Sequence, residues 1–401
     1  MSDAVGKSFV VALNCGSSSI KFALFDVGET PLARTPNWRG TVDGITGSNP
    51  VFRADGIDAV PLTLDSAQPY ATALTYLRQR IVAWLDGRRI TAVAHRIVHG
   101  GSKYFEPVRV DAEVLADLKS YIPLAPLHQP FALEAIAALL EQLPQLPQVA
   151  CFDTAFHQSM PIVEKMLPLP RSTWDEGLRR YGFHGLSYTY LAQVLGEHYG
   201  EEARGRTIVA HLGSGASLCA MHDLQSVATT MGFSALDGLM MGTRCGALDP
   251  GALIYLMQIR KLSLERVARM LYHESGLLGV SGVSSDPRVL LQHQDEVPVQ
   301  QALELYVRSI VREVGGLAAT LNGLDLLAFT AGIGEHQATI RERVCAGLGF
   351  LGVVIDPQAN AANAAVISSP ASRVKVAVEP TNEEWVAATA AASLLNVYPT
   401  G

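Results

Sequence analysis

The sequence predicts an α/β protein made of two related domains, and three observations lead to this fold class. Stretches typical of strands alternate with stretches typical of helices in both halves of the chain. Residues 10–26, VVALNCGSSSIKFALFD, have the pattern of two strands joined by a Gly/Ser turn. Residues 207–223, TIVAHLGSGASLCAMHD, repeat this pattern without gaps, so that Gly213 falls on Gly16. One such hairpin in each half predicts related domains that face each other across a cleft.

The turn of the first hairpin has the composition of a phosphate-binding loop. Asn14 begins it, and Ser17, Ser19 and Lys21 follow. Backbone N–H groups and hydroxyls that converge on one point can hold a phosphate or its metal ion. Gly/Ser turns also join ordinary hairpins, but the repetition of the turn in the second half favours a phosphate-binding role. We therefore predict a two-lobed phosphotransferase.

Composition and charge exclude several classes of protein. The chain has 401 residues, of which 48% are hydrophobic and 17% charged, as expected for a folded protein of two domains. A net charge of −7 without a dense Lys/Arg run argues against nucleic acid as a partner. No apolar run reaches the roughly 18 residues of a membrane span, and the start, MSDAVGK, does not resemble a signal peptide. Five scattered cysteines indicate reduced thiols and a cytoplasmic protein.

Apolar periodicity predicts the remaining elements of the first half in order. The expected elements are a helix over 70–85, a strand over 91–94, helices over 112–121 and 131–143, and a strand over 149–152. Asp111 predicts the N-cap of the second of these helices. The last strand delivers Asp153, and a proline-stiffened loop, PLAPLHQP, carries His128. A Pro-rich stretch over 161–170 predicts a hinge.

The second half follows the same alternation. A helix is expected from Ser187, directly after RRYGFHG, and the repeated hairpin comes next. Residues 231–250 form a Gly-rich stretch that predicts a loop. The expected elements after it are helices over 252–260, 264–273 and 299–322, strands over 326–331 and 374–378, and a terminal helix that starts in PTNEEW.

The chain lacks the G-x-x-x-x-G-K-[ST] loop and the protein-kinase signatures, so those phosphoryl-transfer folds are excluded. It resembles the acetate kinase family, within the superfamily of acetate and sugar kinases, heat-shock ATPases and actin. The stretches that carry the resemblance follow the family's order over nearly the whole chain: NCGSSSIKF, HRIVHGG, LAPLH, FDTAFH, YGFHG, HLGSG, MGTR, SSDPR, AGIGE and PTNEE. The resemblance implies two actin-like, ribonuclease-H-like domains facing across a nucleotide cleft. An acyl-substrate domain would cover residues 1–155 and be joined by the C-terminal helix 384–401, and a nucleotide-binding domain would cover 156–383.

The resemblance implies reversible, Mg²⁺-dependent transfer of the γ-phosphoryl group of ATP to acetate, giving acetyl phosphate and ADP, by a homodimer; Mn²⁺ would be an alternative metal. Arg96 would bind the substrate carboxylate, and Arg244 and His184 would meet the transferring phosphoryl group, for which Arg has a suitable planar fork. The family's catalytic acid/base falls on Asp153. Because a carboxylate nucleophile is already ionised at pH 7, we expect Asp153 to hold the metal or a metal-bound water instead.

The remaining binding residues are also implied by the resemblance. Substrate contacts fall on Arg96, Val98, Leu127, His128, Phe183 and Ala235. Nucleotide contacts fall on Ser17, Ser19, Lys21, His211, Leu212, Gly213, Ser214, Gly215, Asp286, Pro287, Arg288, Gly332, Ile333, Gly334, Glu335 and His336. Metal ligands fall on Asn14 and Glu383. Thr381 and Glu384 have the spacing of a capping box, which gives Glu384 a structural role and leaves Glu383 for the metal.

The chain departs from the family's pattern at five positions, which are Ser214, Ala228, Ala235, Ala247 and His336. None of these removes a catalytic position, but Ala235 replaces a proline in the acyl pocket and enlarges it, whereas Val98 narrows it. Two alternatives therefore stay open. One is a propionate or butyrate kinase, and the other is a catalytically weak nucleotide-binding sensor. Turnover of ATP with and without acetate distinguishes an acyl kinase from a sensor.

Overall fold

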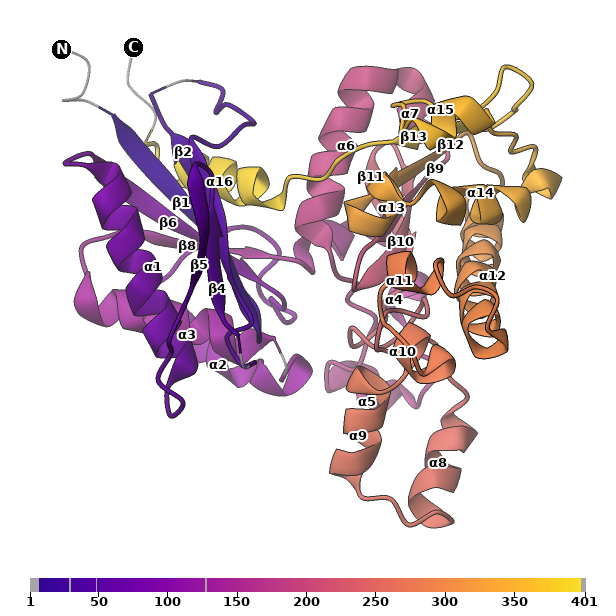
Figure 1. Cartoon of the computed structure of the whole chain (residues 1–401), viewed down its shortest axis with the longest axis horizontal. Helices are drawn as coiled ribbons and strands as arrows, with labels where there is room; N and C mark the ends of the chain where they lie inside the picture. Colours follow the sequence, from indigo (N-terminus) through magenta and orange to yellow (C-terminus); the bar gives the residue numbers. More distant parts are fainter. Residues whose placement is uncertain (1–6, 29, 48, 127, 398–401) are drawn as a thin grey trace. The chain divides into compact units, whose positions relative to one another are not determined.

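The computed structural model describes residues 7–28, 30–47, 49–126 and 128–397. The chain forms two compact units, each built around one β-sheet (Figure 1). Unit 1 ends at Ala155 and resumes at Asn382, and unit 2 is Phe156–Thr381. No helix in the described part of the chain is long and apolar enough to span a bilayer.

The sheet of unit 1 has the strand order β5-β4-β3-β2-β1-β6-β8-β7. Its strands are β1 (Ser8–Cys15), β2 (Ser19–Asp26), β3 (Trp38–Asp43), β4 (Val51–Ala54), β5 (Ile57–Pro61), β6 (Arg89–Ile97), β7 (Val108–Arg109) and β8 (Gln148–Phe152). Strands β1 and β2 form the predicted antiparallel hairpin, and β6 and β8 extend the sheet in parallel. The apolar run at the start of β1 is buried on both faces because the strand lies in the middle of the sheet.

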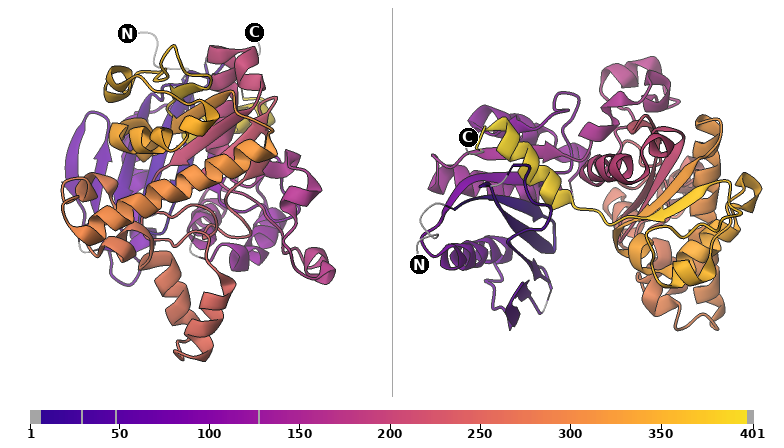
Figure 2. Two further views of the ribbon diagram at one scale, coloured as in Figure 1. Left: turned by 90° about the vertical axis from the view of Figure 1, so that its right-hand side faces the viewer. Right: turned by 90° about the horizontal axis from the view of Figure 1, so that it is seen from above.

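Helices cover both faces of this sheet. They are α1 (Pro69–Leu85), α2 (Ala112–Ser120), α3 (Gln129–Gln142) and α16 (Glu383–Leu394). Helix α16 packs on β1, β2, β6 and β8 (Figures 1 and 2). Helices α1 and α3 pack on the opposite face, where alternate side chains of β1 and β6 point. The end of the chain thus completes the core of the unit in which the chain begins.

Unit 2 repeats the core topology of unit 1. Its strands are β9 (Thr207–Leu212), β10 (Ala216–His222), β11 (Gln225–Thr229), β12 (Leu326–Thr330) and β13 (Lys375–Val378). Their order, β11-β10-β9-β12-β13, matches β3-β2-β1-β6-β8 in unit 1. Strand β10 is antiparallel to its neighbours β11 and β9, and β12 is parallel to its neighbours β9 and β13. The repeat seen in the sequence is therefore a repeat of fold, and the predicted α/β class with two related domains is confirmed.

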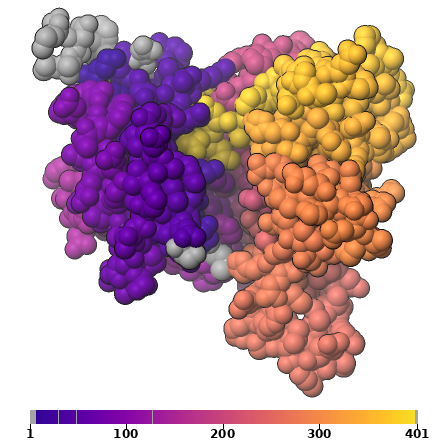
Figure 3. Space-filling view, in the orientation of Figure 1, coloured from indigo at the N-terminus to yellow at the C-terminus, as the bar shows by residue number. Residues whose placement is uncertain are grey.

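The helices of unit 2 are α4 (Ile162–Lys165), α5 (Arg171–Asp175), α6 (Gly185–Tyr199), α7 (Glu201–Arg204), α8 (Pro250–Gln258), α9 (Leu264–His273), α10 (Gly276–Ser281), α11 (Pro287–Leu290), α12 (Val297–Thr320), α13 (Ala331–His336), α14 (Ala338–Ala346) and α15 (Pro357–Ala361). Helix α6 covers one face of the sheet and α12 packs on the other (Figures 1 and 2). Helices α8 and α9 extend away from the rest of unit 2, at the lower right of Figure 3.

Several elements differ from the sequence prediction. Strand β6 continues to Ile97, so Arg96 lies inside the strand and not after its end. The Pro-rich stretch 161–170 does not separate the units, because it lies within unit 2 and contains α4. Strands β3 to β5 were not predicted, since their side chains are largely half-buried or exposed and carry no long apolar run. The segment AGIGEH forms a helix of its own, α13, which the sequence did not predict and which α14 follows.

Candidate active site

In unit 1, the turn between β1 and β2 is tight and open to solvent. The Gly16 N–H donates to the Ser19 carbonyl at 2.9 Å, and the Ser17 and Lys21 side chains are exposed. Asn14 precedes the last residue of β1 and pairs with Lys21 across the hairpin. The predicted phosphate-binding residues of unit 1 therefore lie together at one end of the sheet.

A narrow crevice in unit 1 brings predicted metal and substrate residues together. Asn14 from β1 and Arg96 from β6 line it together with Glu383 and Glu384 from the start of α16. Side chains two residues apart on a strand share a face. The residues of β1 that alternate with Asn14, such as Val11, therefore point to the other face, toward α1 and α3.

Arg96 links two acidic side chains. Its Nε donates to both carboxylate oxygens of Asp153, at 3.0 and 3.1 Å, and one terminal nitrogen donates to Asp153 Oδ2 at 2.8 Å. Its other terminal nitrogen lies 2.8 Å from Glu383 Oε2. Burial alone lowers the pKa of Arg96, but the charges of Asp153 and Glu383 outweigh burial and raise it. All three guanidinium nitrogens are thus engaged by carboxylates that the sequence placed far apart.

The donor set of this crevice fits a magnesium ion. Burial raises the pKa of Glu383 to about 7, Arg96 opposes the shift, and Asp153 and Glu384 add to it. Mg²⁺ usually takes one or two carboxylates and completes its shell with water and phosphate oxygens. Asn14 and Glu383 in the crevice offer such oxygens, and Asp153 offers them on the other side of the Arg96 ion pair. Among the described residues, no three His, Cys, Asp or Glu side chains form a complete metal site by themselves.

The predicted capping box at the start of α16 is wrong. The N-cap is Asn382, whose side-chain oxygen accepts from the Trp385 N–H at 3.1 Å. The Asn382 amide nitrogen also donates to the Arg34 carbonyl at 2.8 Å. Helix α16 therefore begins one residue later than a Thr381 cap requires, and Glu384 is left without a capping role. Its side chain instead faces the same crevice as Glu383.

The residues predicted to surround the acyl group are divided between the two units. Val98 is half-buried directly after β6, and His128 is at the N-cap position of α3 but makes no capping bond. Leu127 lies outside the described residues. Phe183 is buried in unit 2, and Ala235 is partly exposed in its Gly-rich loop. Their assembly into one pocket stays a prediction.

In unit 2, the loop that carries His184 is held by a buried histidine. His157 Nε2 lies 2.9 Å from the Phe183 carbonyl, and its Nδ1 lies 2.8 Å from Ser226 Oγ. Gly182 has a φ of +75°, and a Cβ there would lie 2.4 Å from the His157 ring. Only glycine fits this position without displacing the ring. His184 itself has a φ of 59°, in the left-handed region, so the backbone is strained where a functional side chain is expected.

His184 and Arg244 converge on the turn of the second hairpin. A Cβ placed on Gly215 would lie 3.4 Å from His184 Nε2 and 3.3 Å from a terminal nitrogen of Arg244. The other terminal nitrogen of Arg244 donates to the Ala235 carbonyl at 3.0 Å. Burial lowers the pKa of Arg244, and the nearby Tyr272 opposes the shift. Because Gly215 has no side chain, His184 and Arg244 can both approach its backbone closely.

The HLGSG turn places the remaining residues around this position. The His211 ring stacks on the His184 ring, with centroids 4.2 Å apart and planes 16° from parallel. The Gly213 N–H donates to the Gly215 carbonyl at 3.0 Å and closes the turn. Ser214 is exposed and Leu212 is buried. Of the predicted nucleotide residues, this turn thus groups His211 to Gly215 beside His184.

The SSDPR segment has a complete structural explanation. Asp286 caps the short helix α11 by accepting from the Arg288 N–H at 2.8 Å, and Pro287 is buried at the first turn of the helix. Arg288 also donates from its side chain to both Asp286 oxygens, which lowers the pKa of Asp286. To contact a nucleotide, Arg288 would have to donate to the nucleotide in addition to Asp286 or break its hydrogen bonds to Asp286.

Helix α13, the AGIGEH segment, is fixed by a buried arginine that the sequence did not single out. Arg341 is fully buried and donates to the Gly334 and Glu335 carbonyls at 2.8 and 2.9 Å. Glu335 Oε1 accepts from the Thr381 N–H at 3.3 Å. Open space surrounds Gly332. In this segment Ile333 and Glu335 are partly exposed, Gly332 and His336 are exposed, and Gly334 is buried. Nothing in the sequence distinguishes Arg341 from its partly exposed neighbour Arg343.

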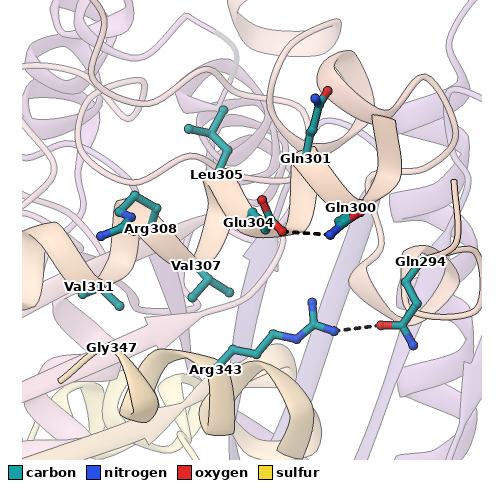
Figure 4. Close-up of a pocket in the computed structure, with 10 residues that line it drawn as sticks. All are labelled: Gln294, Gln300, Gln301, Glu304, Leu305, Val307, Arg308, Val311, Arg343 and Gly347. Atoms are coloured by element: carbon teal, nitrogen blue, oxygen red, sulfur yellow. Dashed lines mark hydrogen bonds between the residues drawn. The ribbon is translucent and has the colours of Figure 1, made fainter. Parts of the chain in front are cut away.

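Two further cavities contain none of the predicted residues. A surface pocket beside α12 is lined by polar side chains, among them Gln294, Gln300 and Arg308; Arg343 donates to Gln294 across it at 2.7 Å (Figure 4). An apolar cleft in unit 1 lies between α1 and α3. Neither cavity therefore contributes to the predicted site.

Comparisons with known proteins identify the family. A sequence model of the acetokinase family matches residues 9–389. The chain is 47% identical to an acetate kinase of Rhodopseudomonas palustris over 94% of this chain and 96% of that one. It is 48% identical to an acetate kinase of Methylocella silvestris over 96% and 98%.

Solved structures agree. A propionate kinase from Francisella tularensis subsp. tularensis superposes with a TM-score of 0.89 at 35% identity, covering 96% of this chain and 98% of that one. An acetate kinase from Porphyromonas gingivalis superposes with a TM-score of 0.84 at 36% identity, covering 97% and 100%. With matching topology, motifs and length, the chain belongs to the acetokinase family.

Proposed function

We propose that this protein is an ATP:acetate phosphotransferase that forms acetyl phosphate and ADP reversibly. The observation that carries the proposal is the convergence of His184 Nε2 and the Arg244 guanidinium over Gly215. Phosphoryl transfer needs little covalent help from a protein, and its main demand is fixed positive and N–H groups around the moving phosphoryl oxygens. Family membership and the named relatives support acetate as the acceptor.

Each of the candidate residues has a separate role in this reaction. The ionised acetate carboxylate attacks the γ-phosphorus in line with the leaving ADP oxygen, and no proton has to be removed from it. Arg244 and His184 donate to the phosphoryl oxygens in the transition state. Arg96 binds the acetate carboxylate, which requires it to release one of its two acidic partners. Unit 1 acts as the acyl-substrate domain and unit 2 as the nucleotide-binding domain.

Magnesium is part of the proposal. Asn14, Asp153 and Glu383 would hold the ion, with Glu384 beside them, and Ser17, Ser19 and Lys21 would meet the phosphates. When bound, Mg²⁺ neutralises charge on the phosphate oxygens. Because Arg96 occupies both oxygens of Asp153, we assign Asp153 to holding Arg96 and the ion and not to proton transfer.

The nucleotide base and ribose are assigned to exposed parts of unit 2. Asp286 to Arg288 and α13 present partly exposed groups in this unit, and the open space beside Gly332 admits a ligand. Ser214 and His336, where the family usually has Asn, would alter nucleotide affinity without affecting the phosphoryl donors.

The experiment is ATP turnover with and without acetate, read as ADP formation and as trapping of acetyl phosphate by hydroxylamine. We expect acetate-dependent turnover and no comparable ATP hydrolysis without it. Arg244→Ala and His184→Ala should each lower kcat by roughly 10²- to 10³-fold, the scale of a lost transition-state donor, with little change in the KM for ATP. Nucleotide binding without acetate-dependent turnover would identify a sensor and overturn the proposal.

A propionate kinase is the second candidate, because a propionate kinase is among the structural neighbours. Val98 narrows the proposed acyl site, whereas Ala235 widens it relative to proline. One methylene in an apolar pocket changes the free energy of transition-state binding, and with it the ratio of kcat/KM values, by the equivalent of about 1–3 kcal/mol. We expect a preference for acetate that Val98→Ala weakens or inverts without changing the ATP parameters. A wild-type preference for propionate would favour the second candidate.

We further propose a cytoplasmic homodimer. All five cysteines, Cys15, Cys151, Cys219, Cys245 and Cys345, are free, as expected in a reducing compartment. Helix α8 buries none of its residues, and its apolar side chains Ile254, Tyr255 and Met257 are exposed. An apolar surface of this kind on a projecting segment favours self-association.

A further inference from the structure

A chain of three side chains ends at His184. Ser217 Oγ lies 2.8 Å from His184 Nδ1 and 2.5 Å from the Tyr188 hydroxyl. Ser217 and Tyr188 are both 0% exposed. Ser217 lies on β10 and Tyr188 on α6, so the Ser217–Tyr188 hydrogen bond joins the helix to the sheet. Neither residue was a candidate site residue in the sequence analysis, although Ser217 lies within the repeated hairpin 207–223.

Hydrogen-bond satisfaction fixes the direction of the chain. Tyr188 makes no other hydrogen bond among the described residues, so its proton has only Ser217 Oγ as an acceptor. Burial raises the pKa of Tyr188, which keeps the phenol protonated. If His184 Nδ1 also donated to Ser217, the Ser217 proton would be left buried without an acceptor, at a cost of about 1–3 kcal/mol. The arrangement that satisfies all three groups runs from Tyr188 to Ser217 to His184 Nδ1.

We infer that Ser217 and Tyr188 are positioning residues that fix His184 as the neutral tautomer with its proton on Nε2. That nitrogen is the one that reaches over Gly215 beside Arg244. The imidazole then presents an N–H to the developing phosphoryl charge while it is neutral, and the stacked His211 ring restrains its plane. The inference deepens the role given to His184 and in that respect rests on the proposed function.

The tautomer is measured first, without substrates. The full-length protein is labelled with ¹⁵N-histidine, and His184→Ala identifies the His184 signals. We expect a protonated-type Nε2 and an unprotonated-type Nδ1 at pH 7.5. A proton on Nδ1 in the wild-type protein overturns the inference, whatever the activity.

Variants then test the two positioning residues. Ser217→Ala should give mixed tautomers and a kcat lower by roughly 10- to 100-fold, the scale seen when metal-binding histidines lose the partner that orients them, with the KM values for ATP and acetate little changed. Ser217→Thr retains the hydroxyl and should restore both readouts. Tyr188→Phe should loosen the tautomer preference with a smaller loss of kcat.

Thr207→Val is the matched control, because it removes a fully buried hydroxyl from the same sheet, at the start of β9. It should change neither the His184 signals nor kcat. A Ser217→Ala protein with wild-type tautomer and wild-type kcat contradicts the inference. If the wild-type protein shows the expected tautomer but no acyl kinase activity, the proposed function fails and the hydrogen-bond chain stands.

Discussion

Arg96 shows how a single side chain can hold a charged site together in the absence of ligands. Without it, Glu383 and Glu384 in the crevice and Asp153, which is only 1% exposed, would have no cation between them. Truncating one partner of a buried ion pair costs about 3–5 kcal/mol, because the remaining charge is unpaired. The same residue that is proposed to bind acetate is therefore also a structural cation.

We predict that Arg96→Ala lowers the free energy of unfolding of unit 1 by about 3–5 kcal/mol at pH 7. Millimolar Mg²⁺ should recover part of this loss, because the ion supplies positive charge to the same carboxylates. Urea unfolding with and without Mg²⁺ measures both effects. The exposed pair Arg204–Asp223 provides the control: Arg204→Ala should have little effect. A fully stable Arg96→Ala protein would show that the carboxylates do not repel one another.

A second residue-scale prediction concerns acid. Burial lowers the pKa of His157 to about 4, whereas an unfolded histidine titrates near 6.5. As the pH falls below 6.5, His157 takes up a proton in the unfolded state but stays neutral in the folded state. The free energy of unfolding therefore decreases from pH 6.5 down to about 4. The loss attributable to His157 is about 2 kcal/mol at pH 5. His157→Gln should be less stable at pH 7 but lose less stability between pH 7 and pH 5. Equal pH dependence in the two proteins would contradict this account.

At the scale of elements, the start of α16 matters most, because this helix returns the chain to unit 1. Its N-cap is Asn382 and not Thr381, whose hydroxyl is buried without a partner among the described residues. We predict that Asn382→Ala costs about 0.5–2 kcal/mol, the scale of a lost N-cap. Thr381→Val should be neutral or stabilising, since it removes an unsatisfied hydroxyl. Thermal unfolding of both variants tests the assignment, and a larger loss in Thr381→Val would restore the capping box.

At the scale of the whole molecule, the projecting pair α8 and α9 carries the prediction. Ile254 and Tyr255 on α8 are 56% and 52% exposed. If this surface forms the proposed dimer, Ile254→Asp and Tyr255→Asp should yield monomers with the fold intact. Light scattering coupled to size exclusion measures the mass, and circular dichroism checks the fold. Val82→Asp, at an exposed apolar position on α1 of unit 1, is the control and should leave the mass unchanged.

Local patterns predicted those elements whose own residues decide their structure. The two hairpins, the Asp111 N-cap and α9 lie where the sequence places them, because apolar periodicity, turn composition and capping are properties of a few neighbouring residues. The repeat of residues 10–26 at 207–223 also predicted the shared topology of the two sheets. The family motifs supplied the candidate residues.

Tertiary structure decided what depends on distant partners. Helix α13 is rich in glycine, which disfavours helices. It is stabilised by Arg341 on α14, whose guanidinium donates both to a carbonyl of α13 and to the Asn360 carbonyl on α15. Thr381 and Glu384 have the spacing of a capping box, but the chain turns at Asn382, where the amide also binds Arg34. The pairing of Arg96 with Asp153 and Glu383, and of His184 with Ser217, joins residues far apart in sequence. Such contacts arise from strand register and packing, and no local pattern of side chains specifies them.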